Sequence, residues 1–393
     1  MNAPGRIARF VFDNSLLLFA GAAAGILWAN VDPASYTALR DLKFPFSLPG
    51  VAGGATLRDL VNEVLMAFFF ALAAKEVWEA MLPGGALRDW RRAATPVLSA
   101  LGGMAGPSLI YVAGALWLGQ FAALGRGWAS PCATDIAFSY VIARLVFGKG
   151  HPAVPFLLLL AIADDAFGLA ILAIFYPVAP VRLAWLGLSV LAVVLGLVMR
   201  RRVRSFWWFL AFPGTLSWVG FAMSGLHPAL GLLPIIPTFP HGRRSDAPVH
   251  WGATDLHNAL DEFESWWSRP VEVVLGLFGF LNAGVVVSAG GTPTLLVLVC
   301  LLAGKPIGIF VTAIVGTKLL GLRLAEGIGK RELFVIGCAA GIGFTVAIFT
   351  ATVAFAPGPI QDSAKLGALC SCLAALVAFL AARLLKIRRA DPK

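Results

Sequence analysis

Two adjacent aspartates, Asp164 and Asp165, lie near the middle of the apolar run 157–175. An ionised Asp at the depth of a bilayer core costs about 2.5 kcal/mol or more, so such residues usually face a water-filled cavity and bind ions or protons. Two neighbouring carboxylates also disfavour each other's ionisation. The pair is therefore a candidate site for competing protons and cations. A soluble core helix is the alternative, which the long apolar flanks disfavour.

Two other apolar runs are interrupted by residues that weaken a helix. The residues of the two breaks are Pro131, Thr134, Asp135, Gly341, Ile342 and Gly343. Proline removes a helical hydrogen bond, and Thr and Asp side chains can satisfy the freed backbone groups. Interrupted spans in corresponding positions of two halves indicate a transporter site at the midplane of the membrane. For the Gly-x-Gly break, close helix packing is an alternative.

A lysine, Lys305, lies inside the apolar run 293–317. A buried ammonium needs a carboxylate or the carbonyls of a helix C-terminus as its partner. Lys305 and Asp135 could therefore neutralise the two kinds of helix end that a pair of broken helices brings together. The alternative for Lys305 is a long side chain that reaches the membrane surface.

The composition indicates the class of protein. Of the 393 residues, 59% are hydrophobic and 13% are charged, and the mean hydropathy is +0.83. A soluble domain carries roughly 25% charged residues, so the sequence predicts an all-α integral membrane protein with a single domain over residues 1–393. The five cysteines match no metal or disulfide spacing and are interpreted as small apolar residues.

Twelve apolar runs are long enough to be predicted as transmembrane helices. They are 11–30, 59–82, 94–118, 128–148, 153–176, 182–200, 205–223, 225–238, 262–286, 293–317, 332–356 and 363–385. The connection at 31–58 is rich in Pro and Gly and is expected to be an irregular external loop or a short hairpin. The polar connection at 239–256 is expected to be a cytoplasmic loop.

The formal net charge is +10, and most of the 31 lysines and arginines fall in one set of alternate loops and in the two end segments. The positive-inside rule then places both termini in the cytoplasm. The basic excess thus reflects membrane topology, and no nucleic-acid partner is expected.

Five short motifs occur in an order and spacing that resemble the NhaA family of bacterial sodium–proton antiporters. They are Ala-Thr-Asp-Ile-Ala-Phe at 133–138, Ala-Ile-Ala-Asp-Asp at 161–165, Asn-Ala-Gly at 282–284, Gly-Lys-Pro-Ile-Gly at 304–308 and Gly-Ile-Gly-Phe-Thr at 341–345. The resemblance implies twelve transmembrane helices in an inverted repeat, with the fourth and eleventh interrupted. It also implies an inner-membrane homodimer and no cofactor beyond the transported Na⁺ or Li⁺ and H⁺.

The resemblance also implies roles for individual residues. Asp165 would bind the cation, and Asp164 would exchange a salt bridge with Lys305 as protons and sodium replace one another. Thr134 and Asp135 resemble the polar pair that the family carries in its fourth helix beside the site.

The chain departs from the family pattern at the positions associated with its pH response. Glu76 matches a glutamate of the cytoplasmic funnel, but the next acid, Glu79, follows after three residues and not four. A serine follows Glu264 where the family has histidine, and His227 resembles the histidine of the family's eighth helix. These four are the pH-response candidates. An exposed ion-pair cluster around Lys75 is the alternative for the two acids near it.

The predicted function is electrogenic, pH-regulated export of Na⁺ or Li⁺ in exchange for protons. Sodium-coupled symport of an organic anion on a similar fold remains an alternative, although no arginine lies in the core to hold a carboxylate. A channel is disfavoured because no selectivity signature is present. An enzyme is not expected because the buried acids lack a nucleophile–base partner set.

Overall fold

A computed structural model describes residues 16–49, 54–88, 90–148, 150–240 and 259–390. Within these ranges the regular secondary structure is helical, apart from one isolated antiparallel bridge between Lys43 and Thr56. The prediction of an all-α fold is therefore confirmed for the part of the chain that the structure describes.

Among the described residues, five helices are long and apolar enough to cross a membrane, as expected of a multi-pass membrane protein. They cover Ala93–Trp117, Ala153–Phe175, Phe206–Ser224, Thr292–Leu319 and Pro359–Leu384. A sixth span would combine Lys330–Ala340 with Phe344–Ala354, which are bent by 53° at their break. Four shorter apolar helices overlap other predicted spans, namely Leu16–Val31, Ile136–Phe147, Leu183–Met199 and Pro228–Thr238. The count of twelve transmembrane helices stays a prediction.

The chain divides into two compact units, each built from separate stretches of sequence. Unit 1 comprises Met1–Tyr36, Asp89–Ile171 and Gly279–Lys393, and unit 2 comprises Thr37–Arg88 and Leu172–Phe278. Three helices, α3 (Pro33–Arg40), α9 (Ala153–Phe175) and α13 (Ala259–Ala283), each run from one unit into the other, so three of the four passages between the units lie within helices. The single-domain prediction remains untested.

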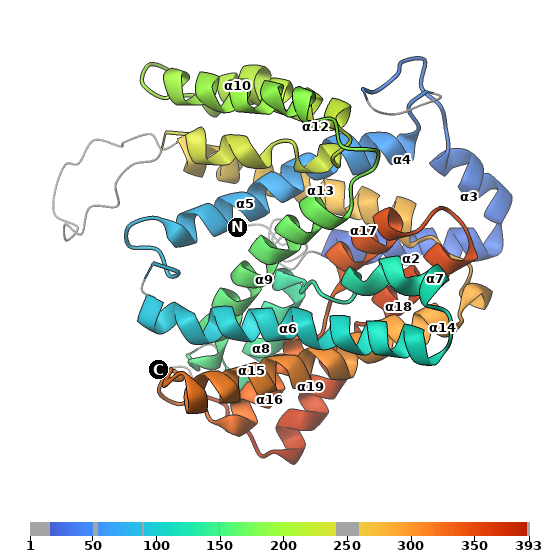
Figure 1. Cartoon of the computed structure of the whole chain (residues 1–393). Coiled ribbons are helices and arrows are strands. Elements are labelled where there is room, and N and C mark those ends of the chain that lie inside the picture. The colour runs from blue at the N-terminus through green and yellow to red at the C-terminus, as the bar shows by residue number, and fades with distance from the viewer. Residues whose placement is uncertain (1–15, 50–53, 89, 149, 241–258, 391–393) are drawn as a thin grey trace, which may run out of the picture. The chain divides into compact units, whose positions relative to one another are not determined.

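Unit 1 contains the helices that carry the two predicted breaks (Figure 1). Besides most of α9 and the end of α13, its elements are α2 (Leu16–Val31), α6 (Trp90–Trp117), α7 (Phe121–Leu124), η2 (Gly125–Ala129), α8 (Ile136–Phe147), η6 (Val287–Ala289), α14 (Thr292–Val299), η7 (Cys300–Gly304), α15 (Lys305–Leu319), α16 (Lys330–Ala340), α17 (Phe344–Ala354), α18 (Pro359–Cys370) and α19 (Leu373–Leu384).

Unit 2 contains most of the other described helices and a second apolar core. Besides most of α13, its elements are α4 (Leu57–Asp59), η1 (Leu60–Leu65), α5 (Met66–Met81), α10 (Leu183–Met199), α11 (Phe206–Phe209), η3 (Leu210–Gly214), α12 (Thr215–Ser224), η4 (Pro228–Leu230) and η5 (Leu233–Thr238). The predicted span at 225–238 thus consists of two short 3-10 helices.

The connection at 31–58 is more ordered than expected. It begins with a helix, α3 (Pro33–Arg40), and then forms the bridge between Lys43 and Thr56. The Asp32 side chain accepts a hydrogen bond from Ser35 N at 3.2 Å, and proline is well suited to the first helical position. The expectation of an irregular segment overlooked this Asp-Pro helix start. Most of the predicted cytoplasmic loop at 239–256 lies outside the described residues.

Glycines allow α6 and α15 to lie in direct backbone contact in unit 1 (Figure 1). A Cβ added to Gly106 would lie 2.4 Å from Gly304 O, and a Cβ added to Gly308 would lie 2.0 Å from Gly102 O. Small residues at such spacing are the usual means by which membrane helices approach closely. The contact fixes the start of α15, where Lys305 lies, against α6.

Gly308→Ala should therefore destabilise the protein. The added methyl group cannot fit against a backbone oxygen, so the helices must separate at a cost of about 1–3 kcal/mol. The thermal unfolding midpoint of the purified protein measures this loss. Gly187→Ala is the matched control, since a Cβ on Gly187 meets nothing within 4 Å. Equal midpoints for the two variants would contradict the packing described for α6 and α15.

Candidate functional site

The carboxylate of Asp135 joins the beginnings of two helices. Residues 130–135 are not helical, and α8 begins directly after them. Asp135 Oδ1 accepts a hydrogen bond from Phe138 N at 3.4 Å, while Oδ2 accepts from Thr345 Oγ1 at 2.8 Å and from Thr345 N at 3.4 Å. Since Thr345 lies in the first turn of α17, one buried carboxylate faces the positive ends of both α8 and α17.

The two breaks are also joined through backbone and hydroxyl groups. Asp135 N donates to Ile342 O at 2.7 Å. Thr134 Oγ1 donates to Ala340 O at 3.2 Å, and Ser139 Oγ donates to Ala339 O at 2.9 Å. Both carbonyls lie at the C-terminus of α16, where backbone oxygens have no partner within their own helix. The hydroxyl groups of α8 and its preceding segment thus satisfy the end of α16.

The remaining break residues occupy the same buried region. Pro131 lies in the non-helical segment before α8, and Gly341 N donates to Cys338 O at 3.2 Å. Gly343 N donates to Ser371 Oγ at 3.3 Å. The predicted break residues are therefore brought together in unit 1.

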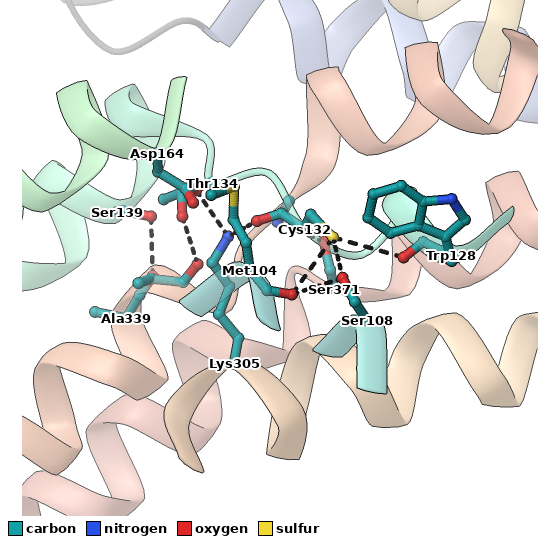
Figure 2. Close-up of polar contacts among 12 residues, drawn as sticks. Met104, Ser108, Trp128, Cys132, Thr134, Ser139, Asp164, Lys305, Ala339 and Ser371 are labelled. Carbon is teal, nitrogen blue, oxygen red and sulfur yellow. Dashed lines mark hydrogen bonds and ion pairs between the residues drawn. The ribbon is translucent and has the colours of Figure 1, made fainter. Parts of the chain in front are cut away.

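Lys305 and Asp164 form an ion pair that is fully buried. Lys305 Nζ lies 2.9 Å from Asp164 Oδ2, and both side chains are 0% exposed. The ammonium also donates to the backbone carbonyl of Cys132 (Figure 2). The interpretation of Lys305 as a residue that reaches the membrane surface is therefore wrong. Its charge is balanced by a carboxylate of α9 and by a carbonyl of the break before α8.

Asp165 differs from its neighbour in environment. Successive residues of a helix point about 100° apart, so Asp165 leaves a different face of α9 from Asp164. Its side chain is half-buried, whereas Asp164 is completely buried. Within the described part of the chain, Asp164 Oδ1 is a buried oxygen without a hydrogen-bond partner. Asp164 is therefore buried in an ion pair, and Asp165 is the more accessible of the two acids.

Three of the pH-response candidates lie around Lys75 in unit 2. Lys75 Nζ lies 2.8 Å from Glu79 Oε2 and also contacts Glu264 Oε2, which joins α5 to α13. Lys75 itself is only 3% exposed, whereas the side chains of Glu79 and Glu264 are 34% and 47% exposed. The alternative of an exposed ion-pair cluster therefore agrees with the acids and is wrong for the lysine. Glu76 is exposed on α5.

The fourth pH-response candidate, His227, is buried in unit 2 beside an acid that the sequence analysis did not single out. His227 Nδ1 lies 3.3 Å from Glu63 Oε2 and accepts a hydrogen bond from Ala229 N at 3.4 Å. Trp218 Nε1 donates to Glu63 O at 2.8 Å. The signal available in the sequence was that Glu63 lies within the apolar run 59–82.

Comparison with known proteins places the chain in one family. The family described as Na+/H+ antiporter 1 matches residues 8–382. A Jannaschia protein named Na(+)/H(+) antiporter NhaA is 48% identical, with 98% of this chain and 99% of that protein aligned. Proteins of the same name from Geobacter sulfurreducens and Desulfitobacterium hafniense are 44% and 40% identical, with 95% and 99% of this chain and 97% and 98% of those proteins aligned.

These names describe antiporters and not symporters, so the symporter alternative is not supported. The family is one of transporters and not of enzymes, and its substrates are cations. With the match covering nearly the whole chain, the protein belongs to the NhaA family of Na⁺/H⁺ antiporters.

Proposed function

We propose that the protein exports Na⁺ or Li⁺ from the bacterial cell in exchange for protons. The observation that carries this proposal is the buried Lys305–Asp164 ion pair, directly beside the half-buried Asp165 and in contact with the helix break before α8. Carboxylate and hydroxyl oxygens are the ligands that small hard cations prefer. The same oxygens bind protons, so the two substrates compete for them.

In this proposal, Asp165 binds the cation and Asp164 takes part by releasing Lys305. Thr134 and Asp135 hold the two breaks together beside the acids. Because the carboxyl groups are adjacent, their proton affinities belong to the pair and not to either residue alone. Cation affinity should therefore fall as the pH falls. Glu76, Glu79, Glu264 and His227 would adjust this response from unit 2.

The proposed setting is the inner membrane, with twelve transmembrane helices, interrupted fourth and eleventh spans and both termini in the cytoplasm. The proposed assembly is a homodimer. If more than one proton enters for each cation that leaves, the exchange carries net charge. The membrane potential then contributes about 2.3 kcal/mol per charge per 100 mV.

Proteoliposomes that contain the purified protein and an imposed pH gradient provide the test. Addition of Na⁺ or Li⁺ should dissipate the gradient, and a potassium–valinomycin clamp at different voltages should change the rate. Empty liposomes supply the background leak. A proton flux that does not depend on Na⁺ or Li⁺ would refute antiport.

A further inference from the structure

The side chain of Cys132 is held in place by several polar contacts, although the residue lies in an apolar run. Its thiol is buried, and Sγ lies 3.0 Å from Ser108 Oγ, 3.6 Å from Met104 O and 3.5 Å from Trp128 O (Figure 2). Its backbone carbonyl is the second partner of Lys305. Non-helical backbone lacks the hydrogen bonds of a regular helix, so side-chain contacts determine where this carbonyl lies.

Helix α6 contacts both residues of the hydrogen bond between the Lys305 ammonium and the Cys132 carbonyl. Ser108 Oγ donates to Met104 O at 2.7 Å within α6. A hydroxyl has one hydrogen and two lone pairs, so Ser108 Oγ can accept from the Cys132 thiol at the same time. The same helix lies against the start of α15 through Gly102 and its neighbours. Thus α6 sets the position of the Cys132 carbonyl and of Lys305 together.

We propose that Ser108 and Cys132 are positioning residues for Lys305. They hold the Cys132 carbonyl oxygen against the ammonium, so that Lys305 keeps a partner once cation binding at Asp165 has released it from Asp164. This inference rests on the proposed exchange function. It assigns a role to a thiol and a hydroxyl whose hydrogen-bond partners are each other and the backbone carbonyls of Met104 and Trp128.

Lys305 has different partners in the cation-free and the cation-bound state of the site. Without a bound cation, the ammonium is shared between Asp164 Oδ2 and the Cys132 carbonyl. Once cation binding at Asp165 releases Lys305 from Asp164, only the carbonyl remains as its partner. Displacing this carbonyl therefore penalises the cation-bound state more than the cation-free state. Apparent Na⁺ affinity should fall, while the rate at saturating Na⁺ is kept.

Cys132→Ala and Ser108→Ala should each raise the KM for Na⁺ in proteoliposomes by about three- to tenfold, the range expected for one intramolecular hydrogen bond. The maximal rate should stay within about twofold of wild type. The double variant should resemble Cys132→Ala, because once the thiol is gone Ser108→Ala removes no further contact with residue 132. Cys132→Ser should restore the KM, since its hydroxyl can replace the thiol in these contacts.

Ser99→Ala provides the matched control on the same helix. Ser99 is fully buried, and its Oγ donates to Thr95 O at 2.7 Å within α6. Its loss removes one buried hydrogen bond without changing the contact with Cys132. The Ser99→Ala variant should keep the wild-type KM for Na⁺.

A wild-type KM in both Cys132→Ala and Ser108→Ala would overturn the positioning role, as would an equal rise in Ser99→Ala or additive effects in the double variant. If Cys132→Ala does not fold, Ser108→Ala decides the question, because it retains the thiol and changes α6 only at one hydroxyl. Wild-type protein without Na⁺-dependent flux in the same assay would instead refute the proposed function.

Discussion

Lys305→Met should lower the free energy of unfolding by about 3–5 kcal/mol, the usual result of removing one partner from a buried ion pair. Lys305 and Asp164 are both 0% exposed and lie 2.9 Å apart. Methionine fills a similar volume but offers no charge, so the Asp164 carboxylate would be left unpaired among apolar side chains. The thermal unfolding midpoint in detergent should therefore fall strongly.

A double variant separates charge from packing in this prediction. Lys305→Met combined with Asp164→Asn removes both charges and should recover most of the lost stability, because neutral pairs avoid the cost of a buried ion. Exchange of Na⁺ for protons should be absent in both the single and the double variant. A Lys305→Met midpoint close to that of wild type, or a double variant less stable than the single one, would contradict the role of this ion pair.

Asp165→Asn should abolish Na⁺-dependent proton flux in proteoliposomes while leaving the protein folded. Asp165 is half-buried, so the neutral amide avoids the cost of a charge at membrane depth. An amide has neither the negative charge that holds a cation nor a proton to exchange near neutral pH. Loss of transport with an unchanged unfolding midpoint is the expected combination.

The matched control for this substitution is Asp32→Asn. Asp32 is exposed before α3, and its side chain accepts a hydrogen bond from Ser35 N. Asparagine serves equally well at this helix start, so both flux and stability should be unchanged. Full transport activity in Asp165→Asn would refute the assignment of the cation site to this carboxylate.

Much of the site was predictable because charges inside an apolar run need partners. Lys305, Asp135 and Asp164 stood out against their surroundings, and a buried ammonium could only be balanced by a carboxylate or by carbonyls. Both kinds of partner are present. The positions of the two breaks were likewise visible from their Pro and Gly residues, and helices end or begin there.

Contacts between residues far apart in the sequence were not predictable in the same way. The hydrogen bond from Ser139 to Ala339 depends on how α8 meets the end of α16, which no local pattern specifies. The interpretation of Cys132 as a small apolar residue overlooked its contact with Ser108, because that contact requires α6 to lie beside the break. Helix α3, in contrast, was missed although its Asp-Pro start is a local signal in the sequence.

Proton release on addition of Na⁺ to purified wild-type protein in weak buffer is the most direct test of competition at Asp164 and Asp165. Na⁺ should release protons, and the Na⁺ concentration needed for half-maximal release should rise as the pH falls, because protons compete for the same oxygens. Asp165→Asn should release none. Na⁺ binding without proton release, or with an affinity independent of pH, would contradict the account.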